Sequence, residues 1–182
     1  MDSISSRRLE VFALWLKALP ADVRGLAAVL TPKEPEAVRV NVAAGLVYLA
    51  RNLDLIPDGI EGIGYLDDAF VLRTSAALAF ESVGPAPSPV LRRLAADNAE
   101  VVSFLGADYT RFREYVIALR HHRTKGHTVT EIATTPALAR DLVAEVQEWC
   151  GTYRESPLQQ DAAELYRLKS FLHAKLALVR TT

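Results

Sequence analysis

The sequence predicts an all-α fold, a multi-helix bundle built around an apolar helical hairpin, with a second helical half after it. Apolar residues recur at the three- and four-residue spacing of amphipathic helices along most of the chain. Alternating apolar and polar runs, which would indicate strands, are scarce. The 182 residues are 50% apolar and 24% charged, which is typical of a folded protein and argues against disorder.

Four helices are predicted in the N-terminal half, residues 1–84. They are expected at residues 5–19, 20–30, 31–52 and 67–83. Pro20 separates the first two, because proline favours the first turn of a helix over its interior. The third begins either with a capping box at Thr31 or at Pro35. The third and fourth helices are very apolar, and they form the predicted hairpin, residues 38–82.

A proline-rich linker, residues 85–89, leads into a C-terminal helical half, residues 90–182, which either has its own core or packs with the first half as one domain. Its helices are expected at residues 88–106, 108–125, 135–150 and 158–180. A loop or a short helix with a capping box at Thr128 is expected between the second and third of these. The last helix carries an apolar stripe that packs on the core or on a second helix. The stripe consists of Leu165, Leu168, Leu172, Leu176 and Val179.

The segment that joins the two hairpin helices, residues 53–66, is unusual, and we call it the connector. It is rich in apolar residues, although loops are normally polar because they face water. It also carries Asp54 and Asp58, and Asp67 and Asp68 follow it directly. A packed, apolar connector must place these four carboxylates with care, because burying a charge is costly.

Two motifs at the connector resemble the signature of the YkvA-like family, a bacterial domain of unknown function. The motif residues are Asp54-Leu55-Ile56-Pro57-Asp58 and Gly64-Tyr65-Leu66-Asp67-Asp68, and the resemblance covers about residues 40–79. It implies a helical hairpin, found in relatives near membranes or in multidomain contexts, and it implies no established activity. Asn52 and Glu61 stand where the family usually has prolines, which implies a looser turn.

The candidate site residues come from these motifs, and they have two interpretations. Asp67 and Asp68 lie where a helix begins and are expected to cap it, and Asp54 and Asp58 are expected to form Asx turns beside Pro57. Alternatively, the four aspartates form a site for a divalent cation such as Mg²⁺ or Ca²⁺, or act as an acid and a base. We favour the structural interpretation, because the segment contains no histidine that could bind a metal and no lysine or arginine that could bind a phosphate. Gly64 and Tyr65 complete the candidate set.

Composition limits the location and the partners. A net charge of −1 argues against nucleic acid as a partner, although basic clusters at residues 111–127 and 167–180 could touch an anionic membrane surface. The single cysteine, Cys150, excludes an intramolecular disulfide and fits a reducing compartment. With no clear signal peptide and no apolar run long enough to span a bilayer, a cytoplasmic protein is expected, with peripheral membrane contact as an alternative.

Three functions remain open on the sequence. The first is a non-catalytic helical interaction or scaffold protein, which binds a protein partner or itself through apolar helices and needs no cofactor. The second is a peripheral membrane protein, and the third is a metal-dependent hydrolase that uses the four aspartates. Phosphate-binding glycine loops, GxSxG and CxxC motifs are missing from the sequence, which favours the first.

Overall fold

The computed structural model describes residues 3–84 and 88–178, and these residues form an all-α bundle, as predicted. The helices are α1 (Ser3–Ala27), α2 (Glu36–Ala50), α3 (Leu66–Val83), α4 (Pro89–Leu105), α5 (Tyr109–Ala118), α6 (Val129–Thr134), α7 (Pro136–Thr152) and α8 (Ala162–Leu178). Two 3-10 turns, Gly106–Asp108 and Leu119–His121, flank α5. The strands β1 (Arg123–Thr124) and β2 (His127–Thr128) pair in antiparallel fashion.

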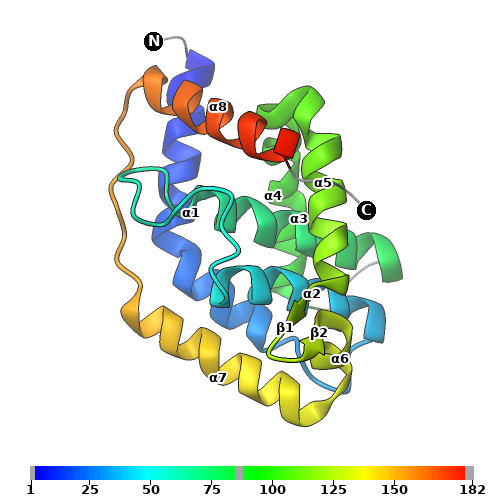
Figure 1. The fold of residues 1–182 in the computed structure, drawn as a ribbon. Coiled ribbons are helices and arrows are strands. Elements are labelled where there is room, and N and C mark those ends of the chain that lie inside the picture. The colour runs from blue at the N-terminus through cyan, green and yellow to red at the C-terminus, as the bar shows by residue number, and fades with distance from the viewer. Residues whose placement is uncertain (1–2, 85–87, 179–182) are drawn as a thin grey trace.

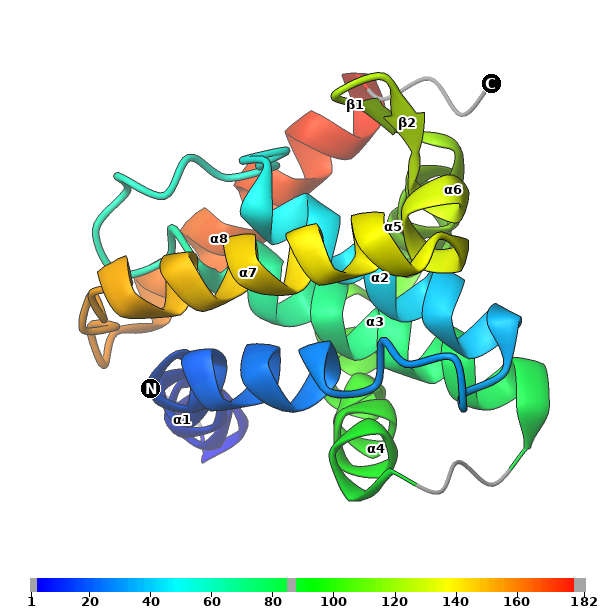
Figure 2. The same cartoon turned by 90° about the horizontal axis from the view of Figure 1, so that it is seen from below.

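The hairpin formed by α2 and α3 lies at the centre of the bundle (Figures 1 and 2). Helix α4 packs along α3, while α6 and α7 cover α2, and α1 crosses both hairpin helices. Residues 40–49 of α2 and 66–76 of α3 are all buried. Burial on every side explains why these helices are apolar on every side. The other helices therefore form the outer surface of the bundle. The buried apolar side chains of α1 to α8 form one continuous cluster.

Pro20 does not start a new helix, contrary to the prediction. Helix α1 continues through it from Ser3 to Ala27. Figures 1 and 2 show instead that α1 changes direction along its length, and proline is a common cause of such a kink because its ring clashes with the preceding turn. Asp22, two residues after Pro20, is buried in the bundle. At the next boundary α2 begins after Pro35, so the second of the two predicted starts is correct.

Asn52 gives α2 a specific end. Its φ of 48° lies in the left-handed region, and the Leu53 N–H donates to the Tyr48 carbonyl at 3.2 Å. A left-handed residue together with a backbone hydrogen bond across the last turn is a Schellman motif. The left-handed residue of this motif is usually glycine and sometimes asparagine. A proline could not occupy this position, because its ring fixes φ near −65°. The departure at Asn52 therefore changes how the helix ends.

The predicted helix over residues 108–125 is wrong beyond Ala118. The chain turns through Leu119–His121 into the short hairpin of β1 and β2. Lys125 and Gly126 have φ values of 48° and 86°, and positive φ at both central residues is the requirement of the two-residue turn that best fits a hairpin. The capping box after it is confirmed, since Thr128 Oγ1 accepts from the Glu131 N–H at 3.1 Å and the Glu131 carboxylate accepts from the Thr128 N–H at 2.6 Å.

The last two helices differ from prediction at their ends. Helix α7 passes Gly151, the expected stop, and ends at Thr152. Helix α8 begins at Ala162 and not near residue 158, because Leu158 belongs to an irregular segment, in which its own side chain is buried against the bundle. The four described leucines of its stripe are buried on the core, and Val179 lies outside the described residues. Of the predicted linker, residues 85–87 also lie outside them, and Pro89 opens α4 as expected.

Candidate functional site

The connector is tied to both hairpin helices by Asp67. The Tyr48 hydroxyl from α2 donates to Asp67 Oδ2, and the Ile56 N–H donates to the same oxygen at 2.9 Å. The Leu55 N–H donates in turn to the Tyr48 hydroxyl oxygen at 2.8 Å. Tyr48 and Asp67 are fully buried, so these bonds are shielded from water. We call this set of three hydrogen bonds the Tyr48–Asp67 clasp.

Two further features shape the connector. The Pro57 carbonyl accepts from the Ile60 N–H at 2.9 Å, which closes a turn beside Pro57. At Gly64, a Cβ atom would overlap the Asp58 carbonyl and lie 2.9 Å from the Ile60 carbonyl oxygen. A side chain at this position would therefore force the connector backbone to move. Pro57 and Gly64, both named from the motifs, thus serve the shape of the turn.

Neither Asp67 nor Asp68 caps α3, contrary to the structural prediction. The residue before the helix is Tyr65, and no side chain accepts a capping hydrogen bond there. Both aspartates lie in the first turn, where a carboxylate still complements the helix dipole. Both are turned into the interior instead of back toward the free N–H groups. Asp58 Oδ1 does not accept the hydrogen bond of the expected Asx turn, since it is buried without a hydrogen-bond partner.

The aspartates form an acidic cluster with few compensating bonds. Asp67 Oδ1 and Asp68 Oδ1 are buried and lack partners, as Asp58 Oδ1 does. Burial, and the neighbouring Asp67, Asp58 and Asp54, hold the pKa of Asp68 well above its ordinary value. Burial and repulsion from Asp54 raise the pKa of Asp58 to about 6. Burial also raises the pKa of Asp54 and of Asp67, so the cluster retains protons more strongly than free carboxyls do.

Aromatic residues and the segment before α8 cover this cluster. The Tyr65 ring packs against Tyr153 and Trp149 of the α7 end, with ring centroids 4.9 and 6.0 Å apart. The Gly62 N–H donates to Ser156 Oγ at 2.9 Å. Gly62 has a φ of 82°, and a Cβ there would lie 3.2 Å from Glu164 Oε2. Residues from the far end of the chain therefore pack against part of the connector.

A buried ionic network that the sequence did not reveal connects α3 to α1 and α4. Arg73 is fully buried, stacks on the Trp15 ring at 3.8 Å, and donates to Asp22 Oδ2 at 3.2 Å. Arg93 donates to the other oxygen of Asp22 at 2.5 Å. Asp97 lies 3.7 Å from both arginines. The available signal was that Arg73 is the one basic residue of α3 and follows an apolar run, residues 69–72, so that its charge must find a buried partner.

Within residues 3–84 and 88–178, no group of three or more histidine, cysteine, aspartate or glutamate side chains is arranged to hold a metal ion. Asp54, Asp58, Asp67 and Asp68 are thus near enough to affect one another's pKa, and they are not grouped as the ligands of a single cation. The connector has the properties of a packed structural turn.

These features define the class of the protein as a helical bundle organised around an internal, clasped hairpin. Residues 38–73, which span α2, the connector and the first part of α3, match the DUF1232 family, whose description is a protein of unknown function. The resemblance to the YkvA-like family is confirmed over these residues, which form a DUF1232 domain. Comparisons with curated proteins and with solved structures found no match.

Proposed function

We propose that this protein is a non-catalytic helical interaction protein, in which the DUF1232 domain is a rigid internal frame for the outer helices. The Tyr48–Asp67 clasp is the observation that carries this proposal. Asp67 uses one oxygen to accept two hydrogen bonds from Tyr48 and Ile56, and it is fully buried. A carboxylate that serves the fold in this way is not presented to a substrate.

Burial of the hairpin also directs where a partner would bind. The apolar side chains of α2 and α3 are covered by neighbouring helices, so a partner would contact helices at the surface. Large apolar side chains are exposed there, among them Ile4 and Leu14 on α1 and Tyr166 on α8. Exposed apolar groups that share a helix face are a common feature of protein interfaces.

The other two functions have weaker support. The hydrolase needs a set of convergent carboxylates, and the described aspartates are not arranged as ligands of a single ion. Peripheral membrane contact needs a surface that is both basic and apolar. The apolar hairpin is buried, so the support for this function comes from the basic clusters at residues 111–127 and 167–180 alone. Among the helices that the structure describes, none is long and apolar enough to cross a membrane.

Thermal unfolding with added Mg²⁺, Mn²⁺ and Ca²⁺ tests the non-catalytic part of the proposal. Binding of a cation to the folded state raises the melting temperature by mass action. We expect no shift for the parent protein or for an Asp58→Asn, Asp68→Asn variant. A rise of several degrees in the parent, lost in the variant, would contradict the proposal and favour the hydrolase.

Photo-crosslinking inside the cells that express the protein tests the interaction part of the proposal. A benzophenone side chain placed at Leu14 or at Tyr166 is expected to give a protein adduct from at least one of these outer helices. Glu61, which is exposed on the connector, is the control position. The absence of a protein adduct at both Leu14 and Tyr166 would contradict an interaction role.

A further inference from the structure

One side of α1 carries a set of residues that are exposed or half-buried. Ile4 and Leu14 are 67% and 63% exposed, and Val11 between them is half-buried. Arg7 and Glu10 on the same stretch are exposed. We call these five residues the α1 face. Figure 2 shows α1 at an edge of the molecule.

Helical spacing brings the five residues into one stripe. Steps of three and four residues, from Ile4 to Arg7, Val11 and Leu14, follow one side of a helix, and Glu10 lies one turn from both Arg7 and Leu14. The stripe ends before the kink region at Pro20 and spans about 15 Å, at 1.5 Å per residue. Its apolar residues are therefore at both ends and at the centre, with one charge of each sign between the ends.

The two charges of the α1 face have no ion-pair partner among the described residues. Neither Arg7 nor Glu10 forms a salt bridge there, although they are three residues apart. The neighbouring Arg8 differs, because it pairs with Glu100 at 2.6 Å and donates to Ser103 Oγ at 3.0 Å. Arg8 thus holds α1 against α4, while Arg7 and Glu10 are left for contacts outside this chain.

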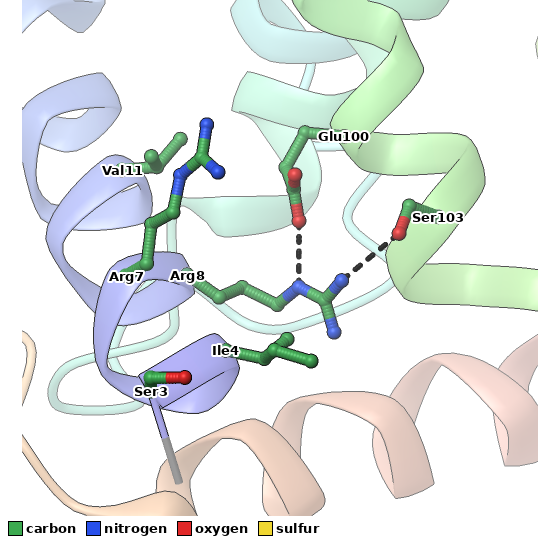
Figure 3. A pocket seen from close by; sticks show the side chains of 7 residues that line it. All are labelled: Ser3, Ile4, Arg7, Arg8, Val11, Glu100 and Ser103. Carbon is green, nitrogen blue, oxygen red and sulfur yellow. Dashed lines mark hydrogen bonds and ion pairs between the residues drawn. The ribbon is translucent and has the colours of Figure 1, made fainter.

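A hollow lies at the Ile4 end of the α1 face (Figure 3). It is a surface pocket of about 400 Å³ between α1 and α4, lined on α1 by Ile4, Arg7 and Val11 among others. The view shows the Ile4 side chain below the Arg8 guanidinium and the Arg7 side chain rising beside Val11. The Leu14 end carries the opposite shape, an exposed side chain that projects from the helix.

We propose that the α1 face binds a second copy of this chain, with the two α1 helices antiparallel about a two-fold axis near residue 9. This inference rests on the proposed interaction function and names its partner. Two-fold rotation about an axis near residue 9 places Ile4 against Leu14 of the second copy, since 4 and 14 are equally far from 9. It places Arg7 beside Glu10 of the second copy at nearly the same level.

Each of these contacts occurs twice, because a two-fold interface is self-complementary. Leu14 of each copy reaches the mouth of the pocket beside Ile4 of the other. Arg7 of each copy meets Glu10 of the other, so that the free charges are satisfied. An anionic membrane fits the face less well, because Glu10 stands in the middle of the stripe and would be repelled.

The first test is the mass of the protein in solution by light scattering and sedimentation equilibrium. We expect the parent chain to dimerise and Leu14→Glu to be monomeric, because the substitution replaces the apolar contact with Ile4 by a carboxylate that is costly to remove from water. Tyr166→Glu, which changes a side chain that is 78% exposed on α8, is the matched control and keeps the dimer. Circular dichroism should show equal helix content for all three proteins.

The second test exchanges the charges. Arg7→Glu and Glu10→Arg should each weaken the dimer at least tenfold, since each places like charges opposite one another. An equimolar mixture of the two variants should associate again, because their heterodimer restores two opposite-charge pairs. A change in helix stability alone could not produce this recovery on mixing.

Two results would overturn the second copy as the partner. The first is a parent protein that is monomeric at all concentrations, and the second is a dimer whose affinity is unchanged by Leu14→Glu and by the charge exchange. The crosslinks separate this failure from failure of the proposed function. An adduct of two copies at Leu14 supports both, while an adduct with a different protein keeps the interaction function and rejects self-association. Binding of the monomer to anionic vesicles through Leu14 likewise rejects the second copy.

Discussion

At the scale of single residues, two adjacent aspartates have different roles. Asp67 receives two hydrogen bonds that hold the connector to α2, whereas Asp68 Oδ1 receives none. Both are buried, so the difference comes from the donors that each carboxyl meets. An unpaired buried carboxyl is most stable when protonated, which agrees with the raised pKa of Asp68. The pair is therefore a structural element with a pH dependence.

Asp58 provides the pH prediction that can be tested most simply. Its folded pKa of about 6 exceeds the ordinary value of 3.8, so the folded protein binds this proton more tightly than the unfolded chain does. The stability it contributes is complete below pH 3.8 and is lost as the pH rises toward 6. The stability of the Asp58→Asn variant minus that of the parent should therefore be larger at pH 7.5 than at pH 4.5. Melting curves across this range check the sign, and an opposite trend would contradict the burial of Asp58.

At the scale of elements, the ends of helices depend on single backbone angles. Asn52 ends α2 in a left-handed conformation, and Lys125 with Gly126 turns the chain between β1 and β2. Neither position has a distinctive apolar pattern, so periodicity alone extends the helix past residue 118 and passes over the strands. The capping box at Thr128 was visible, because it depends on two side chains at a fixed spacing.

Substitution of Asn52 tests the Schellman end of α2. Asn52→Pro, which restores the residue usual in the family, should destabilise the fold by about 2–3 kcal/mol, because proline cannot adopt a φ of 48°. Asn52→Gly, the matched control, should remain within about 1 kcal/mol of the parent, since glycine adopts this angle freely. Urea unfolding measures both values, and a stable proline variant would rule out the left-handed end.

The contact between α1, α3 and α4 depends on the buried network of Asp22, Arg73 and Arg93. Asp22→Ala should cost about 3–5 kcal/mol, because it leaves the Arg73 guanidinium buried beside the more distant Asp97 alone. Arg93→Ala removes a half-exposed partner and should cost about 1 kcal/mol. Equal losses in urea unfolding would show that the network does not depend on the burial of Arg73.

At the scale of the whole molecule, the sequence predicted the fold class and the hairpin, because both follow from apolar periodicity over long segments. It placed the motif residues in one region and did not predict what they contact. The clasp needs Tyr48, whose hydroxyl reaches Asp67 across the connector, and the network needs Asp22, 51 positions before Arg73. Such pairs depend on tertiary packing, which neither spacing nor composition encodes.

The extent of each half and the linker at residues 85–89 stay predictions. The continuous core, which includes side chains from α1 through α8, is the physical basis on which the two halves would unfold together. The covering of the connector by Tyr153 and Ser156 adds contacts between residues that are distant in the chain. The other helices of the bundle thus cover most of α2 and of the first part of α3.

The most direct test of a structural DUF1232 motif is the free energy of unfolding in urea of Asp67→Ala against the parent. The substitution leaves the buried Tyr48 hydroxyl and the Ile56 N–H without an acceptor, which predicts a loss of about 2–5 kcal/mol. Asp67→Asn, which keeps one acceptor oxygen, should lose less. Unchanged or increased stability in Asp67→Ala would contradict the account, because a carboxyl that the fold does not need is retained for chemistry.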